Sequence, residues 1–337
     1  MALIHFTKKG FYCPQADLYI DPWRPVKRAV ITHAHADHCR SGHKSYLAHN
    51  DSLAAMRYRF GAKLPVRGVE FGESITLNGV KISLHPAGHI IGSAQVRLEY
   101  KGEVWVISGD YKTKDDGLVP PFEAVSCHSF ISECTFGLPV FRWKDQAIIR
   151  KEIMDWHRQN IELGQQTILV GYSLGKAQRL LHLLKDFQGG FFAHKAIHQT
   201  TKVLRESGIE LPETKPLSNS VKRDELLGNI VLVPPAAADS NAIKKLGKSS
   251  TGIASGWMAL RGMRRRRAVD RGFVLSDHAD WTGLNEAIRA TGAEQVYLTD
   301  GYTEIFKKYL GDEGLNCKVV ETEYSDREGD QEESSSS

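Results

Sequence analysis

The stretch Ile31-Thr-His-Ala-His-Ala-Asp-His-Cys39 places three histidines and an aspartate within six positions. It follows the apolar run Ala29-Val30-Ile31, which is typical of the end of a buried strand, so the polar groups would lie on the loop that leaves this strand. His33 and His35 are two residues apart, and an extended backbone turns both rings to one side. Imidazole and carboxylate groups together suit zinc, iron or manganese. The stretch therefore predicts a metal site.

Asp37 and His38 follow one turn later and can face a neighbouring point, so the loop offers more ligands than one ion needs. The alternative interpretation is a polar loop whose histidines hydrogen-bond to one another. It is the weaker of the two, because ligands packed this densely gain little from their proximity without an ion.

The composition favours a reduced protein without a membrane segment. The 337 residues suffice for one large domain or two ordinary ones, and the formal charge is +4. Five cysteines without Cys-x-x-Cys spacing fit free thiols. No apolar run approaches about eighteen residues, and Met1–Gly10 lacks a signal-peptide core. These features predict a cytoplasmic location.

Three stretches of different character follow one another. Residues 1–137 are rich in strands, with hairpins around Asn78-Gly79 and Lys101-Gly102 and a helix at 50–60. After Gly137, strands alternate with helices, which indicates a small parallel sheet. The helices are expected at 144–163, 176–187, 196–207 and 240–246, and the strands at 166–171 and 230–233. The last part has strands at 272–281, 295–298 and 318–322 and helices at 285–290 and 304–310. From Ser325 the acidic, serine-rich composition predicts disorder.

The spacing His-x-His-x-Asp-His at 33–38 resembles the signature of the metallo-β-lactamase fold. Pro86-Ala-Gly-His-Ile-Ile-Gly-Ser93 and Val106-Ile-Ser-Gly-Asp-Tyr111 follow in the matching order and supply His89 and Asp110. The resemblance implies two divalent ions, zinc or manganese. The ligands of the first ion would be His33, His35, His89 and Asp110. Those of the second would be Asp37, His38 and a bridging Asp110, and Asp21 would orient the ligand loop.

Two further motifs resemble the β-CASP branch of this superfamily, whose members cut nucleic acids. Ser132-Glu-Cys-Thr-Phe-Gly137 is similar to the first motif, with Glu133 as its acidic residue. Leu275-Ser-Asp-His-Ala-Asp280 is similar to the second, with His278 as its histidine. Tyr172–Arg179 resembles the element that opens a helix of the inserted domain.

The third motif of the branch departs from the pattern. Asp300 stands where members commonly have a histidine. An aspartate can still bind the second ion, but it is a harder ligand and adds negative charge. Asp300 is therefore expected to be a ligand, with the identity and occupancy of the second ion left open.

Up to about Tyr324, the chain is similar to one bacterial group, the DNA-ligase-associated exonucleases. Ala254–Met258, Arg264–Arg267, Ala268–Phe273 and Leu275–Trp281 carry this similarity. It implies an α/β fold in which a metallo-β-lactamase αββα sandwich (1–137 and 269–324) is interrupted by an inserted β-CASP α/β domain (138–268), followed by a disordered tail (325–337). It also implies DNA rather than RNA as the partner, a functional association with a DNA ligase and a helicase, and no membrane.

Phosphodiester hydrolysis explains why these residue types are needed. Two ions about 3.5–4 Å apart stabilise the attacking and leaving oxygens and activate a water near neutral pH, and Asp37 belongs to this machinery. The leaving oxygen needs a proton, for which His278 is the candidate acid, with Glu133 fixing its tautomer. A metal ligand or a structural histidine is the alternative for His278, and a surface carboxylate for Glu133.

Two sets of polar residues are candidates for substrate binding. The first set is the basic run Arg264, Arg265, Arg266 and Arg267. It can follow a nucleic-acid backbone, although basic runs are also common on solvated surfaces. The second set, at the start of the helix expected at 176–187, is Ser173, Lys176 and Arg179. Such a helix start can hold a terminal phosphate.

The hypothesis is a metal-dependent phosphodiesterase that acts on nucleic acid, with a DNA exonuclease of DNA repair favoured. An RNA-processing nuclease of the same fold would use the same residues. A thioester or lactone hydrolase would also share the metal ligands, but the insertion, the basic run and the Glu133–His278 pair favour a long anionic substrate. A nucleic-acid-binding protein with a degenerate metal site has only Asp300 in its support.

Overall fold

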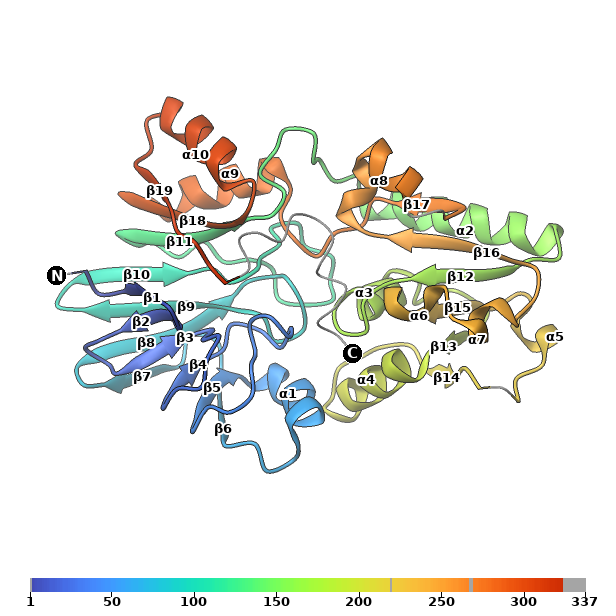
Figure 1. Ribbon diagram of the computed structural model, residues 1–337, viewed down its shortest axis with the longest axis horizontal. Coiled ribbons are helices and arrows are strands. Elements are labelled where there is room, and N and C mark those ends of the chain that lie inside the picture. Colours follow the sequence, from blue (N-terminus) through green and yellow to red (C-terminus); the bar gives the residue numbers. More distant parts are fainter. Residues whose placement is uncertain (1, 219, 267–268, 324–337) are drawn as a thin grey trace. The chain divides into compact units, whose positions relative to one another are not determined.

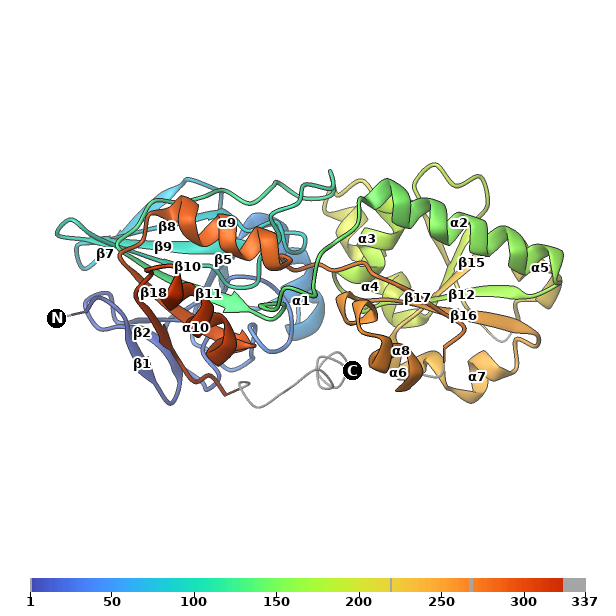
Figure 2. The same cartoon turned by 90° about the horizontal axis from the view of Figure 1, so that it is seen from above.

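The computed structural model describes residues 2–218, 220–266 and 269–323. The chain divides into two compact units (Figures 1 and 2). Of the described residues, unit 1 contains 2–141 and 277–323, and unit 2 contains those within Arg142–Ser276. All five cysteines are free thiols. In the described part of the chain, no helix has both the length and the apolar character needed to cross a membrane.

The first sheet of unit 1 carries the ligand-rich stretch. Its six strands lie in chain order: β1 (His5–Thr7), β2 (Gly10–Cys13), β3 (Leu18–Ile20), β4 (Ala29–Val30), β5 (Tyr46–His49) and β6 (Val66–Val69). β1, β2 and β3 pair antiparallel, and β3 to β6 pair parallel. β5 leads into η1 (Asn50–Ser52) and α1 (Leu53–Phe60), which confirms the helix predicted at 50–60.

The second sheet of unit 1 has seven strands in the order β19-β18-β11-β10-β9-β8-β7. They are β7 (Ser74–Leu77), β8 (Val80–Pro86), β9 (Ala94–Tyr100), β10 (Glu103–Ile107), β11 (Ser129–Cys134), β18 (Gln295–Gly301) and β19 (Cys317–Val319). β7 to β10 form an antiparallel meander, whereas β10, β11, β18 and β19 pair parallel. Both predicted hairpins are confirmed. Asn78, Gly79, Lys101 and Gly102 all have positive φ, as two-residue hairpin turns of type I′ require.

Alternate residues of the second sheet face two different cores. Trp105 and Ile107 of β10 lie in a core that also includes Leu18, Ile20 and Val30 of the first sheet. Val104 and Val106 face the opposite side, where α9 (Trp281–Thr291) and α10 (Thr303–Asp312) cover the sheet (Figure 2). The strand period of two therefore buries both faces of this sheet.

Unit 2 is built on one parallel sheet, which confirms that prediction. The strand order is β14-β13-β15-β12-β16-β17. The strands are β12 (Gln166–Val170), β13 (Phe191–Ala193), β14 (Thr214–Pro216), β15 (Ile230–Val233), β16 (Ser249–Ala254) and β17 (Arg271–Phe273). The helices are α2 (Gln146–Glu162), α3 (Lys176–Leu183), α4 (Lys195–Glu206), α5 (Arg223–Leu226), α6 (Pro235–Ala238), α7 (Asn241–Lys244), η2 (Gly256–Ala259) and α8 (Arg261–Arg266).

The strand predicted at 272–281 is wrong in its extent. β17 ends at Phe273 and pairs with β16, so this apolar run belongs to the sheet and core of unit 2. Unit 2 therefore extends to Ser276, beyond the boundary expected at 268. His278 lies on the loop before α9, and Asp280 caps that helix by accepting from Gly283 N at 2.9 Å. The disorder predicted from Ser325 falls outside the described residues.

The shared core of the two sheets in unit 1 is testable with Leu98→Ala. Leu98 lies in β9 and has no exposed surface. The truncation should lower the free energy of unfolding by about 2–5 kcal/mol, because the neighbouring side chains cannot fill the cavity fully. Urea denaturation measures this change. Lys81→Ala, at an exposed position of the neighbouring β8, is the control and should change stability by less than about 0.5 kcal/mol. Equal stability of the two variants would contradict the shared core.

Candidate metal centre

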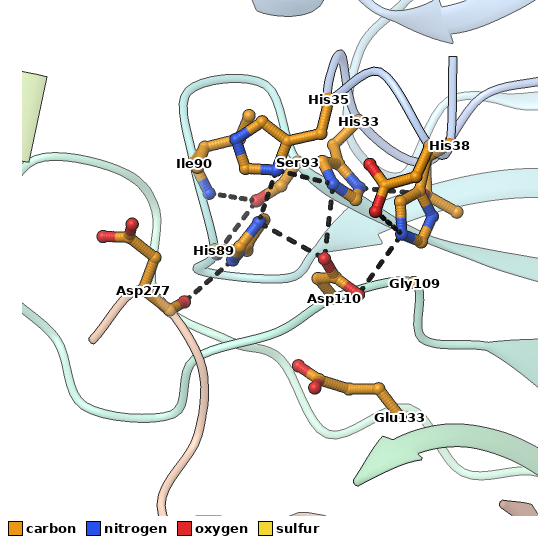
Figure 3. A network of polar contacts seen from close by, with 12 residues as sticks. His33, His35, His38, His89, Ile90, Ser93, Gly109, Asp110, Glu133 and Asp277 are labelled. Carbon is orange, nitrogen blue, oxygen red and sulfur yellow. Dashed lines mark hydrogen bonds and ion pairs between the residues drawn. The ribbon is translucent and has the colours of Figure 1, made fainter. Parts of the chain in front are cut away.

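The candidate ligands lie on loops that follow strands of unit 1. The loop after β4 holds the four polar residues His33, His35, Asp37 and His38. His89 follows β8, and Asp110 follows β10. Loops are free to turn several donors toward one point, whereas the strands fix where each loop begins. The three segments meet in space, as Figure 3 shows.

Four donor atoms from these loops form one compact group (Figure 3). His35 Nδ1 lies 3.1 Å from His33 Nε2 and 3.1 Å from His89 Nε2. Asp110 Oδ2 lies 3.5 Å from each of those Nε2 atoms. Ligands about 2.0–2.1 Å from a tetrahedral zinc ion lie about 3.3–3.4 Å from one another. The donor spacing therefore fits a divalent ion of this kind.

In His33 and His89, the ring nitrogen that faces away from the centre has a hydrogen-bond partner of its own. This partner fixes which nitrogen faces the centre. His89 Nδ1 donates to the carbonyl oxygen of Asp277 at 2.9 Å, which leaves the lone pair on Nε2. Thr32 Oγ1 donates to Asp21, so it accepts from His33 Nδ1 at 3.1 Å. Burial, and then repulsion by neighbouring imidazoles, lowers the pKa of His33 and of His89 well below the usual value. Both rings are therefore neutral donors near neutral pH.

A second group of donors lies beside the first and shares Asp110. His38 Nε2 lies 3.4 Å from Asp110 Oδ1 and 3.9 Å from Asp37 Oδ2. Burial alone would lower the pKa of His38, but these carboxylates and Asp21 outweigh it and raise the pKa well above its usual value. The same negative field attracts a divalent cation. Asp110 directs one oxygen to each group, which is the arrangement of a bridging ligand (Figure 3).

Asp21 holds the ligand loop from behind. Its Oδ1 accepts from Thr32 N at 2.8 Å, and its Oδ2 accepts from Thr32 Oγ1 at 2.5 Å and from His38 Nδ1 at 2.8 Å. Gly109 allows the Asp110 loop to approach, because its φ is +55° and a Cβ would lie 2.7 Å from Thr32 Cβ. Thr32 thus connects Asp21, the ligand loop and the Asp110 loop.

Glu133 and His278 form a buried pair next to Asp110. His278 Nδ1 lies 2.8 Å from Glu133 Oε1, which also accepts from Tyr111 N at 3.0 Å. Glu133 Oε2 accepts from the N–H of Thr135 at 3.3 Å and from its hydroxyl at 2.5 Å. Although Asp110, Glu133 and His278 lie close enough to hold a metal, these four donors occupy both oxygens of Glu133. Glu133 is therefore placed to orient His278 rather than to bind an ion.

Asp300 is partly buried, and the charge of His38 acts on its carboxyl group. It lies near the end of β18 with φ +52°, and its Oδ1 accepts from Thr322 Oγ1 at 2.8 Å. Burial raises the pKa of its carboxyl group. Among the described residues, neither cluster of three or more close potential ligands includes Asp300. Asp300 therefore lies within electrostatic reach of His38 and belongs to neither of these two clusters.

The residues expected to bind substrate lie in unit 2. Lys176 and Arg179 are buried, and the ammonium group of Lys176 donates to the Leu275 carbonyl at 2.8 Å. Ser173 is buried before α3. Arg264, Arg265 and Arg266 fall in α8, but their side chains are outside the described part of the structure, and Arg267 lies outside the described residues.

Three contributors to the centre were not found from the sequence. Thr32, the carbonyl group of Asp277 and Arg59 all act through contacts between segments. The guanidinium group of Arg59 donates to Ala34 O at 2.6 Å, inside the His-x-His segment. A backbone carbonyl leaves no trace in a sequence. Arg59, in contrast, lies in a recognisable Arg-Tyr-Arg-Phe pattern at 57–60.

Known proteins provide an independent comparison. No protein-family model matches the chain. A probable DNA ligase from Opitutus terrae is 32% identical over 314 residues, which cover 92% of this chain and 30% of that protein. The RNase aCSPSF2 from Saccharolobus solfataricus is 25% identical over 48% of this chain and 38% of its own length. The endoribonuclease ysh1 from Aspergillus fumigatus is 27% identical over 36% of this chain and 14% of its own length. The chain thus spans less than half of each of these relatives.

One solved structure has a similar fold. A protein of unknown function from Enterococcus faecalis matches with a TM-score of 0.59 and 11% identity. The match covers 88% of this chain and 79% of that chain. At this identity the likeness concerns the fold alone.

Asp21→Asn tests the support behind the ligand loop. An amide cannot accept all three hydrogen bonds that Asp21 receives, so His38 should lose its orientation. The affinity for the second divalent ion should fall about 10- to 100-fold, while the first ion is retained. Titration calorimetry with zinc, together with metal analysis, measures both. The matched control is Asp17→Asn, a similar left-handed position whose carboxylate pairs with Arg28 instead. Two ions bound with unchanged affinity in Asp21→Asn would refute this role.

Proposed function

The chain belongs to the β-CASP branch of the metallo-β-lactamase superfamily, and on this premise we propose that it is a metal-dependent nuclease that hydrolyses DNA. The observation that carries the proposal is the position of Asp110. One of its oxygens faces the group of His33, His35 and His89, and the other faces His38. Such a bridge is what a site for two ions needs in phosphodiester hydrolysis.

The two units correspond, in this proposal, to the two domains of the branch. Unit 1, with two sheets around one core and α9 and α10 on an outer face, would be the αββα sandwich. Unit 2, with its parallel sheet, would be the inserted β-CASP domain. The strand order and the interrupted sequence of unit 1 support this assignment.

The donor chemistry suits zinc or manganese, because imidazole and carboxylate groups bind both. The first ion would be held by His33, His35, His89 and Asp110, and the second by Asp37, His38 and Asp110. Bound there, the ions would supply Lewis acidity toward a phosphoryl oxygen and would acidify an attacking water. Asp300, whose carboxyl group feels the charge of His38, is a candidate for completing the second site.

His278 supplies the proton in this proposal. Its Nδ1–H donates to Glu133, so Nε2 is the atom that can carry a proton to the leaving oxygen. The carboxylate of Glu133 would stabilise the imidazolium form, and its three other hydrogen bonds hold it in place. His278 adjoins the first donor group, because its ring centroid is 4.6 Å from that of His89.

DNA is favoured over RNA because the similarity to the probable DNA ligase extends over 92% of this chain. The relatives named as RNases or endoribonucleases match over 48% or less of the chain. An RNA substrate is nevertheless the second candidate, since two of these relatives carry that activity in their names. We also propose that the nuclease acts with a DNA ligase in repair and trims DNA from an end.

Cleavage assays with Asp37→Asn test the nuclease directly. The substrates are end-labelled single-stranded DNA and RNA of the same sequence, each with manganese, zinc or a chelator. The native protein should shorten DNA from one end only when metal is present. Asp37→Asn should lose nearly all cleavage while remaining folded, and Asp17→Asn should cleave normally. Cleavage of RNA alone would make the protein an RNA nuclease. No cleavage of either polymer by the metal-loaded native protein would overturn the proposal.

His278→Ala separates proton transfer from metal binding. The variant should keep both ions and cleave about 10²- to 10⁴-fold more slowly, because the leaving oxygen lacks its acid. Metal analysis and single-turnover cleavage measure the two properties. His198→Ala is the control. His198 contacts Thr214 in unit 2, so this variant should cleave normally. Loss of an ion from His278→Ala would identify His278 as a ligand instead.

A further inference from the structure

The end of α1 presents cationic and aromatic side chains in alternation. The segment is Arg57-Tyr58-Arg59-Phe60, followed by Lys63 just beyond the helix. Arg57, Arg59 and Lys63 are exposed, and 48% of Tyr58 is accessible. Attraction to the helix C-terminus accounts for the two arginines. It does not account for an exposed tyrosine between them, or for a lysine outside the helix.

The surrounding sequence has a small excess of positive charge. Residues 37–73 contain six lysines and arginines and four carboxylates, and none of these carboxylates lies between positions 52 and 69. Arg67 forms an ion pair with Glu73. Within the described residues, no carboxylate lies within ion-pair distance of Arg57, Arg59 or Lys63. Arg57 and Lys63 are therefore available to an anionic partner, whereas Arg59 is held by Ala34 O, by the Phe60 ring and by attraction to Asp37.

This segment adjoins the metal centre. Arg59 Nη1 donates to Ala34 O at 2.6 Å, and Ala34 lies between two of the candidate ligands. Arg40 follows Cys39 directly at the end of the ligand loop, and its charge acts on Arg59. A strand bound along α1 would therefore reach the ligand loop beside Arg59.

A cavity of about 450 Å³ lies beside the same segment. Its walls come from the residues after Arg40 and from those after Arg59, and they include Tyr46, Phe60, Leu64 and Pro65. Lys63 is the charged residue in its lining. An apolar and aromatic hollow with one cation suits the base of a nucleotide whose phosphate remains outside.

We propose that Arg57–Lys63 is a binding surface for the single-stranded part of the nucleic-acid substrate. Arg57 and Lys63 contact phosphates, and Tyr58 stacks on an unpaired base. The inference rests on the proposed nuclease function and extends it, because it states which form of nucleic acid is bound and along which helix it lies.

Binding measured without cleavage tests this surface. Fluorescence anisotropy of a labelled 20-nucleotide oligo(dT) is followed in chelator over a series of salt concentrations, for the full chain and its variants. Tyr58→Ala should weaken binding about 5- to 100-fold, whereas Tyr58→Phe, which keeps the ring, should bind as the native protein does. Arg57→Ala and Lys63→Ala should each reduce the slope of log Kd against log salt by about 0.7. Lys81→Ala, on an exposed position of β8, should leave affinity and slope unchanged.

The outcomes separate this surface from the nuclease itself. A native protein that binds and cleaves, with Tyr58→Ala, Arg57→Ala and Lys63→Ala all unchanged, would overturn the surface and leave the nuclease intact. Equal loss of binding in Tyr58→Ala and Tyr58→Phe would remove the stacking role and overturn the proposal for single strands. A native protein that neither binds nor cleaves DNA or RNA would overturn both.

Discussion

The close packing of imidazole and carboxylate groups around Asp110 is the constraint on which the arrangement of the loops in unit 1 depends. Imidazoles and carboxylates from separate segments lie within hydrogen-bonding distance of one another, in a place largely closed to water. Burial raises the pKa of Asp110 to about 8, and it lowers the pKa of His33 and His89. Such a cluster is unfavourable by itself and becomes favourable when a divalent cation takes up the charge. The sheets hold the loops against this repulsion.

Carboxylates that do not face the ions maintain this arrangement. Asp21 and Glu133 each receive hydrogen bonds on both oxygens, which fixes their side chains and the rings that they contact. They differ in what they orient. Asp21 turns His38 toward the second donor group, whereas Glu133 turns His278 toward the leaving oxygen of the proposed reaction. In the proposed reaction, metal binding and proton transfer would therefore depend on separate contacts, so each could be disturbed alone.

The density of cations along the sequence does not indicate which of them lie near the candidate ligands. The basic run at 264–267 is the most conspicuous charge feature of the sequence, yet it lies in unit 2 and at the limit of the described residues. The exposed cations of α1 are fewer and are spaced by aromatic residues, but a hydrogen bond from Arg59 joins them to the ligand loop. For an extended anionic substrate, continuity with the metal centre matters more than the local density of charge.

The sequence by itself predicted the hairpins, the first helix, the parallel sheet of unit 2 and the donor residues that the structure brings together around Asp110. These depend on side-chain chemistry and on periodicity within short segments, which a sequence displays directly. Only the tertiary structure decided where β17 ends and why Thr32 and the Asp277 carbonyl group matter. Each of these depends on contacts between segments far apart in the chain, such as His89 with Asp277. Local pattern cannot show them, because the strand that an apolar run joins and the surface that a helix exposes are set by packing.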